Sequence, residues 1–190
     1  MYYDRLRQRV RAVVRARRDA EAAHVDITSC LAACYLPIHE EVQAGTHTIF
    51  HLPGGRGSCK SSFVSLEIVD GIMKDPEANG IVFRKTAATM RESVFSQIAW
   101  AIDALGASSL WKGYVSPMVF TYTPTGQQIL FRGLDDAAKL KSIRPRKGTF
   151  KYVWFEEFSE LNGANQVSTD SDIALHNALP QMSALLTSGS

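Results

Sequence analysis

Residues 54–62, with the sequence GGRGSCKSS, constrain the fold of this chain more than any other feature. They follow the apolar run 48–52 and open a segment, 61–73, whose pattern is typical of a helix. Glycines lack a Cβ atom, so the chain can curl until several backbone N–H groups point at one anion. The positive N-terminal end of the following helix adds to that attraction. Strand, glycine-rich turn with Lys-Ser, and helix therefore predict a phosphate-binding loop.

The loop assigns chemistry to individual side chains. Lys60 is expected to reach the β- and γ-phosphates of a nucleotide, and the Ser61 hydroxyl to bind Mg²⁺. The predicted nucleotide-binding residues are Gly54, Gly55, Gly57, Ser58, Cys59, Lys60, Ser61 and Ser62. The pattern G-x-x-x-x-G-K-[ST] requires glycine where this chain has Cys59, and a small side chain fits there only if its φ is not strongly positive. The alternative is an ordinary glycine-rich turn with a chance Lys-Ser pair.

A second feature is the segment 150–157, FKYVWFEE, which reads as a buried strand ending in two acids. Carboxylates at the carboxyl end of a central strand are what a nucleotide hydrolase needs. We predict that Glu156 binds Mg²⁺, through water, and that Glu157 positions and polarises the attacking water. Taken by itself the pair is also compatible with a solvated strand end, but its spacing from the loop favours a P-loop nucleotide hydrolase.

Five stretches then resemble one family in order: residues 54–68, 82–86, 90–102, 124–143 and 154–157. The fourth contains FRGLDD followed by KLKS, which is not a general property of P-loop proteins. Over residues 27–163 the chain resembles the ATPase domain of phage terminase large subunits, of the PBSX-like type.

This resemblance implies a DNA-packaging motor in which ATP hydrolysis with Mg²⁺ drives double-stranded DNA into a capsid. It implies a homo-oligomeric ring, a portal protein and a terminase small subunit as partners, and the cytoplasm of a bacterial host. Arg56 is expected to act at the γ-phosphate or to couple to DNA, and joins Lys60 and Glu157 as a catalytic candidate. Members of this family also carry a C-terminal nuclease domain, to which no part of this sequence is expected to correspond.

The order of elements predicts an α/β fold, a P-loop sheet of the ASCE/RecA-like type flanked by helices. Right-handed crossovers would bring the loops with Lys60, Arg84 and Glu156 to one edge. Expected strands are 47–52, 80–84, 118–122, 128–132 and 150–157, the third and fourth forming a hairpin at the sheet edge. Expected helices are 2–23, 26–35 (stopped by Pro37), 39–44, 61–73, 86–105 and a turn at 135–143.

Three parts are expected along the chain: a basic helical arm (1–26), the ATPase domain (27–163) and an atypical tail (164–190). The tail is rich in Ser, Thr and Asp, which favours a truncated or disordered end, with a helix over 173–186 as the alternative. The first 18 residues carry seven arginines and one acid, so their charge is +6, and the rest of the chain is −4 because the whole is +2. The arm is suited to nucleic acid or an acidic protein, or is a solvated helix.

A second basic group, which either tracks DNA phosphates or is a solvated loop, comprises Lys139, Lys141, Arg144, Arg146 and Lys147. No apolar run approaches the length of a membrane span, and the three cysteines form neither a C-x-x-C pair nor a zinc quartet.

Several questions stay open at this stage. Arg84, Arg91 and Arg132 are candidates to stabilise charge on the transferred phosphoryl group, or are structural ion-pair partners. Tyr35 stacks on the adenine or packs in the core, and Asp135 and Asp136 bind metal or cap a helix. Two other functions compete with the motor ATPase: a degenerate terminase that binds nucleotide or DNA without efficient turnover, and a helicase or kinase of another P-loop lineage.

Overall fold

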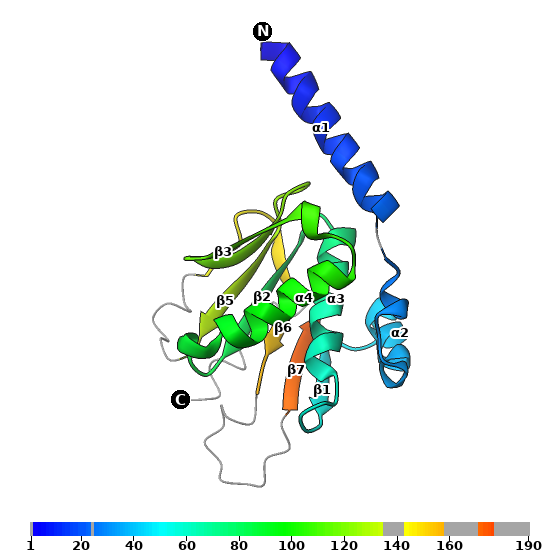
Figure 1. The fold of residues 1–190 in the computed structure, drawn as a ribbon, viewed down its shortest axis with the longest axis vertical. Coiled ribbons are helices and arrows are strands. Elements are labelled where there is room, and N and C mark those ends of the chain that lie inside the picture. The colour runs from blue at the N-terminus through cyan, green and yellow to red at the C-terminus, as the bar shows by residue number, and fades with distance from the viewer. Residues whose placement is uncertain (1, 24, 135–142, 158–170, 177–190) are drawn as a thin grey trace.

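The computed structural model describes residues 2–23, 25–134, 143–157 and 171–176 (Figure 1). Within them lies a seven-stranded sheet of order β1-β7-β6-β2-β5-β4-β3. The strands are β1 (Ile49–Pro53), β2 (Ala78–Arg84), β3 (Trp111–Val115), β4 (Met118–Tyr122), β5 (Gln128–Gly133), β6 (Thr149–Phe155) and β7 (Ser171–His176). Together with the helices packed on it, this sheet confirms the predicted α/β fold class.

Strand direction decides where the loops of the sheet emerge. β2 runs parallel to both β5 and β6, whereas β7 runs antiparallel to β6 and to β1. β1 therefore has the same direction as β6 and β2, and the carboxyl ends of all three meet at one edge. Because neighbouring strands lie about 4.8 Å apart, the intervening β7 sets β1 and β6 about 10 Å from each other.

Two helices cover one face of the sheet, α3 (Lys60–Lys74) and α4 (Ser96–Ala104), side by side in Figure 1. Their apolar side chains pack with alternate residues of the strands, including Val82 and Trp154, into the larger core. The residues between these, such as Ile81 and Val153, belong to a second apolar cluster, as expected for strand side chains that alternate between faces.

The helix α3 packs against Tyr152 of β6 at a glycine, Gly71. At Gly71, buried in α3, an added Cβ atom would lie 2.0 Å from the Tyr152 hydroxyl and 2.4 Å from its ring carbon Cζ. The absence of a side chain at Gly71 therefore allows the helix that follows the glycine-rich loop to pack directly on the strand that carries the two acids.

The N-terminal part differs from the expectation beyond α1 (Tyr2–Ala23), which is helical as predicted. Residues 26–35 do not form one helix but two short 3₁₀ turns, η1 (Ile27–Ser29) and η2 (Ala33–Tyr35). Pro37 does not stop a helix; it lies in the first turn of α2 (Leu36–Ala44), where its missing N–H has no cost. Gly45 ends α2 in the left-handed conformation with φ 64°.

The predicted helix over 86–105 is also divided. It consists of a 3₁₀ turn η3 (Ala87–Thr89), a π-helical turn η4 (Arg91–Phe95), and α4. The predicted core positions are nevertheless buried: Val94, Ile98, Ala101, Ile102 and Leu105 are at most 3% exposed.

On the other side of the sheet, β4 and β5 form the predicted antiparallel hairpin. They do not end the sheet, because β3, which was not predicted and which follows the 3₁₀ turn η5 (Ser108–Leu110), pairs with β4 outside them.

The C-terminal expectation needs a correction. Ser171–His176 is neither a helix nor part of a disordered tail but an inner strand paired on both sides. Residues 135–142 of the turn predicted at 135–143 lie outside the described residues, and so do residues 158–170 and 177–190. The predictions for Asp135, Asp136, Lys139 and Lys141 therefore stay predictions.

Candidate nucleotide-binding site

The loop between β1 and α3 has the curled backbone that an anion cradle requires. Gly54 has φ 154° and Gly57 has φ 83°, backbone angles that residues with a side chain rarely adopt. A Cβ atom on Gly54 would lie 3.0 Å from the Ser58 side chain, so the loop closes tightly on itself. The backbone N–H of Ser58 donates to the Gly55 carbonyl, 3.3 Å away, which completes the turn.

Two polar side chains of the loop are drawn inward. Lys60, 8% exposed, donates from Nζ to the Gly54 carbonyl at 2.7 Å, so its ammonium lies across the loop. The Ser58 hydroxyl is buried and has no hydrogen-bond partner in the part of the chain that the structure describes. A buried hydroxyl without a partner is costly, and an anion in the loop would accept its hydrogen bond. The loop therefore fits a phosphate group.

Cys59 does not meet the condition that the sequence set for it. Its φ is 59° and its ψ 11°, which is the left-handed region, and it is the N-cap residue of α3, although its side chain makes no capping hydrogen bond. This is the conformation for which the motif uses glycine, and a residue with a Cβ atom adopts it at a cost of about 1–2 kcal/mol. The exposed side chain contacts the Gly57 carbonyl through Sγ at 3.7 Å.

The two acids follow β6 at the same edge of the sheet. The backbone N–H of Glu156 donates to the Phe83 carbonyl at 3.0 Å, which extends the pairing of β6 with β2 by one residue. Glu157 then turns away with φ 53°, a second non-glycine residue in the left-handed region. Both side chains are largely buried, with 12% of Glu156 and 31% of Glu157 exposed.

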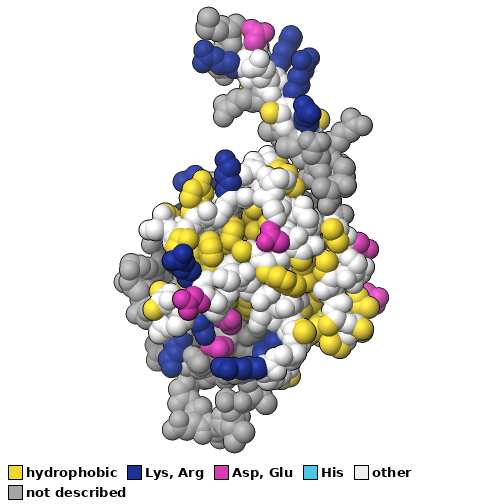
Figure 2. Space-filling model, in the orientation of Figure 1, with side chains coloured by type: hydrophobic (Ala, Val, Ile, Leu, Met, Phe, Trp, Pro, Cys, Tyr) yellow, Lys and Arg dark blue, Asp and Glu magenta, His cyan; other side chains and the backbone are white. Residues whose placement is uncertain are grey.

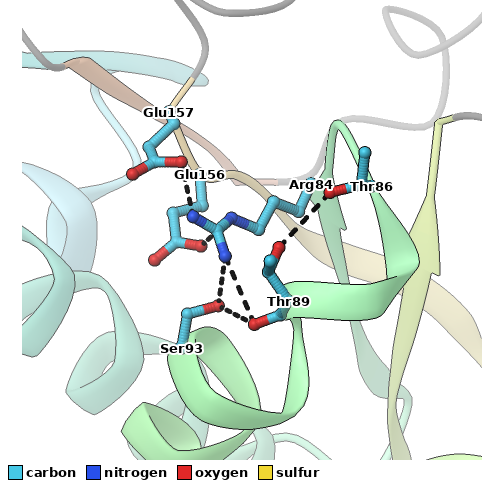
Figure 3. A network of polar contacts seen from close by, with 6 residues as sticks. All are labelled: Arg84, Thr86, Thr89, Ser93, Glu156 and Glu157. Carbon is cyan, nitrogen blue, oxygen red and sulfur yellow. Dashed lines mark hydrogen bonds and ion pairs between the residues drawn. The ribbon is translucent and has the colours of Figure 1, made fainter.

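Both carboxylates share one cation (Figure 3). Arg84, the last residue of β2, approaches Glu156 Oε2 with Nε at 3.1 Å and donates to Glu157 Oε2 from Nη2 at 2.6 Å. Its Nη1 donates to the Thr89 carbonyl at 3.2 Å and to the Ser93 hydroxyl at 3.1 Å. Among the three arginine candidates the structure thus brings Arg84 to the acids. Arg132 donates instead to the carbonyl of its neighbour Phe131, and Arg91 lies exposed in η4.

A cavity of about 330 Å³ joins the loop to the acids. Its lining consists of Gly55, Arg56, Gly57, Ser58, Cys59, Lys60, Ser61, Ser62, Glu156 and Glu157. All three predicted catalytic residues and both predicted metal ligands therefore border one space. Among the described residues there is no group of three or more His, Cys, Asp or Glu that could hold a metal ion. The Ser61 hydroxyl and the Glu156 carboxylate at the cavity are oxygen groups, the ligand type that Mg²⁺ takes from a protein beside phosphate and water oxygens.

Of the two roles that the sequence left open for Tyr35, stacking on adenine or packing in the core, the structure shows core packing. It is 8% exposed and stacks on Phe63 of α3, with ring centroids 4.7 Å apart. Its hydroxyl donates to the Ser58 carbonyl at 2.8 Å. The same residue thus packs in the core and bonds the backbone of the glycine-rich loop.

Sequence reasoning did not find the Tyr35–Ser58 bond, nor the role of Thr89 and Ser93 beside Arg84. No local pattern marks them, because each contact joins residues from different elements. The available signals were a tyrosine upstream of the loop and a serine about two turns into the expected helix 86–105.

Comparison with known proteins supports the resemblance. The family model described as phage terminase large subunit matches residues 46–173, more than half of the chain. The chain belongs to the phage terminase large subunit family. The match includes both walls of the cavity, the glycine-rich loop and the strand that carries the acids.

Two relatives with curated names agree with this assignment. The large subunit terminase of Bacillus phage SPP1 is 38% identical over 146 residues, which are 77% of this chain and 34% of that protein. The PBSX phage terminase large subunit of Bacillus subtilis strain 168 is 34% identical over 110 residues, 58% of this chain and 24% of that protein. The chain thus spans about a third or less of the length of these relatives.

Of the helices that the structure describes, none has the length and apolar character needed to span a bilayer.

Proposed function

We propose that this chain is the ATP-hydrolysing part of a terminase large subunit, which uses Mg²⁺–ATP to drive double-stranded DNA into a capsid. The observation that carries the proposal is the single cavity bordered by Lys60 on one side and by Glu156 and Glu157 on the other. The roughly 10 Å between β1 and β6 leaves room for the triphosphate and its metal between the two walls.

The residues divide the work as follows. The N–H groups of the loop and the start of α3 bind the phosphates, and Lys60 leaves the Gly54 carbonyl to neutralise them. Ser61 and, through water, Glu156 would hold Mg²⁺, and the ion would neutralise the charge that develops on the phosphates. Glu157 orients and polarises the attacking water. Arg56, exposed at the cavity, acts at the γ-phosphate or couples hydrolysis to DNA.

In this proposal the basic arm, residues 1–26, binds the DNA. α1 stands away from the sheet in Figure 1, and dark blue side chains line it in Figure 2. Arg7 and Arg11 are exposed on it, four residues apart and therefore on one helical face. With +6 on the first 18 residues and −4 on the rest, the arm concentrates the positive charge that DNA phosphates attract. A ring of subunits, a portal protein, a small subunit and the cytoplasm of a bacterial host complete the proposal.

Phosphate release tests the reaction. With Mg²⁺ and ATP, the wild type is expected to release phosphate, Lys60→Ala to lose both binding and release, and Glu157→Gln to bind nucleotide while release falls at least about a hundredfold. Lys112→Ala and Glu77→Gln, at exposed positions away from the cavity, are the matched controls. Phosphate release that survives in Glu157→Gln would contradict the assigned role.

The second candidate function is a terminase chain that binds nucleotide or DNA without efficient turnover. The observation that favours it is the left-handed backbone of Cys59, which strains the loop at the entrance to α3. This candidate predicts that Mg²⁺–ATP raises the melting temperature of the wild type while no phosphate is released. The two functions are thus separated by measuring thermal stabilisation and phosphate release on the same sample.

A further inference from the structure

The helix α1 carries an exposed apolar stripe. Leu6, Val10 and Val14 follow one another at intervals of four residues, so they lie on one side of the helix, and they are 48%, 55% and 60% exposed. α1 points away from the sheet in Figure 1, beyond the point where the backbone N–H of Val25 donates to the Leu105 carbonyl at 3.3 Å. Helices gain most of their stability by packing an apolar face, so this stripe is suited to a partner.

A row of arginines runs beside the stripe. Arg7, Arg11 and Arg15 are exposed, and each comes one residue after a stripe residue, which places it about 100° further round the helix. The helix therefore has an apolar side and a basic side, and a protein can cover the first while the second stays available to DNA. Two such arms are poor partners for each other, because each carries +6 over residues 1–18.

The body of the molecule has an apolar groove that fits such a helix. A hollow of about 330 Å³ lies between α3, α4 and the segment before α2. Its lining includes Phe63 and Leu66 of α3, Trp100 of α4, and Leu31 and Ala32 of that segment. In Figure 2, hydrophobic side chains gather on this face of the molecule, beside α2. Trp100 is 43% exposed, and an exposed tryptophan at an apolar groove is typical of a binding surface.

The charges near the groove complement those of the arm. Asp103 is exposed and lies three residues after Trp100, on the same side of α4. Asp26 is exposed in the chain that leads to the groove residue Leu31. Residues 19–190 as a whole carry −4, against +6 on residues 1–18. Opposite charges steer and orient an association, so the body of a second copy attracts the arm.

We propose that the arm of one copy docks with Leu6, Val10 and Val14 in the groove of the next copy. Amphipathic helices bind apolar grooves through anchors at this spacing. The contact joins two different surfaces, so it repeats head to tail, the type of contact from which rings are built. The inference rests on the ring of subunits in the proposed function and names the contact that builds it. Because Cys59 of the glycine-rich loop also lines the groove, the arm lies against the nucleotide site of its neighbour.

Sedimentation equilibrium at increasing protein concentration, without nucleotide or DNA, tests this. The wild type is expected to associate. Leu6→Gln combined with Val10→Gln, the stripe variant, removes apolar anchors but keeps good helix formers, and should weaken association at least about tenfold. Ala32→Arg places a bulky cation at an exposed position of the groove and should act in the same way. Tyr114→Gln combined with Val115→Gln removes two exposed apolar side chains of β3 and is the matched control, which should associate like the wild type.

A mixture of variants shows which surfaces meet. The stripe variant keeps the groove and Ala32→Arg keeps the stripe, so equal amounts of the two should form heterodimers although neither variant associates by itself. Association of Ala32→Arg by itself would mean that arms pair with arms and would overturn the inference. The tryptophan emission of the wild type should shift to shorter wavelength as it associates, because Trp100 becomes covered, and that of the stripe variant should stay constant.

Other occupants of the groove give different results. A wild type that stays monomeric, with emission at shorter wavelength than the stripe variant, would mean that the arm covers the groove of its own chain. A blue shift when Mg²⁺–ATP is added to the stripe variant would mean that the nucleotide base occupies the groove. Either result overturns the docking of a second copy.

The failures are distinguishable. If the wild type does not associate, or if the control variant weakens association as much as the stripe variant, this inference falls, while phosphate release and its loss in Glu157→Gln still decide the proposed function. A chain that forms the heterodimers but releases no phosphate keeps the docking contact and loses the proposed reaction.

Discussion

The Tyr35 hydroxyl donates a hydrogen bond of 2.8 Å to the carbonyl of Ser58, inside the glycine-rich loop between β1 and α3. The tyrosine comes from η2 and its ring is stacked on Phe63 in the first turn of α3. The segment before β1 therefore holds both the loop and the helix that follows it. Because preorganised N–H groups bind an anion without the cost of ordering them, we expect this bond to raise the affinity for nucleotide as well as the stability of the fold.

Tyr35→Phe removes the bond and keeps the stacked ring. We expect the free energy of unfolding to fall by about 1 kcal/mol, the typical net value of one hydrogen bond, and the affinity for nucleotide to fall with it. Urea denaturation and titration with a fluorescent nucleotide measure the two effects. Tyr114→Phe, at a 53% exposed tyrosine on β3, is the control and is expected to change neither. Wild-type affinity in Tyr35→Phe would show that the loop keeps its shape without this bond.

Cys59→Gly should stabilise the protein. A Cβ atom in the left-handed region costs about 1–2 kcal/mol, against about 0.5–1 kcal/mol for the extra freedom of glycine in the unfolded chain. The expected gain is several tenths of a kcal/mol to about 1 kcal/mol in urea denaturation. Cys59→Ala is the matched control, because it removes the contact of Sγ with the Gly57 carbonyl but keeps the Cβ atom. A large rise in phosphate release in Cys59→Gly would show in addition that the loop of the wild type limits turnover.

The sequence predicted the parts of the site that depend on local pattern. Two local patterns predicted that Lys60 and Glu156 lie at one site: a strand, glycine-rich loop and helix in order, and an apolar strand ending in acids. The structure places both residues at one cavity. The predictions of secondary structure were wrong where contacts between residues far apart in the sequence determine the conformation. Residues 171–176 are short and polar at both ends, so their sequence does not indicate a strand, and their pairing with β1 and β6 is what makes them one. The π turn at 91–95 is equally invisible, since its residues match an ordinary amphipathic helix.

Gly71→Ala tests how closely α3 packs against β6, through its effect on the free energy of unfolding. In an exposed helix this change is stabilising by about 1 kcal/mol. Here the new Cβ atom would lie 2.0 Å from the Tyr152 hydroxyl, and overpacking of a core costs about 1–3 kcal/mol. We therefore expect a net loss of about 1 kcal/mol or more in the free energy of unfolding. In a Tyr152→Ala background the same change should be neutral or stabilising, and an equal loss in both backgrounds would exclude the clash as its cause.

Glu67 gives the protein a pH-dependent term in its stability. It is buried on α3, and its carboxylate Oε1 lies 2.5 Å from His39 Nδ1 on α2, with Gln43 Nε2 3.4 Å from its other oxygen. Burial raises the pKa of Glu67 above its ordinary value of 4.5, since it penalises the charged form, although the contact with His39 lowers it and nearby Asp70 raises it further.

A carboxyl whose pKa is higher in the folded than in the unfolded state binds protons more tightly when folded. Its contribution to stability is fully present below pH 4.5 and is lost as the pH rises through the pKa of the folded state. The difference in unfolding free energy between the wild type and Glu67→Gln should therefore fall from pH 4.5 to pH 7 in urea denaturation. Glu40→Gln, exposed on α2, should show no such trend. A difference that grows with pH would mean that His39 stabilises the ionised carboxylate by more than burial costs.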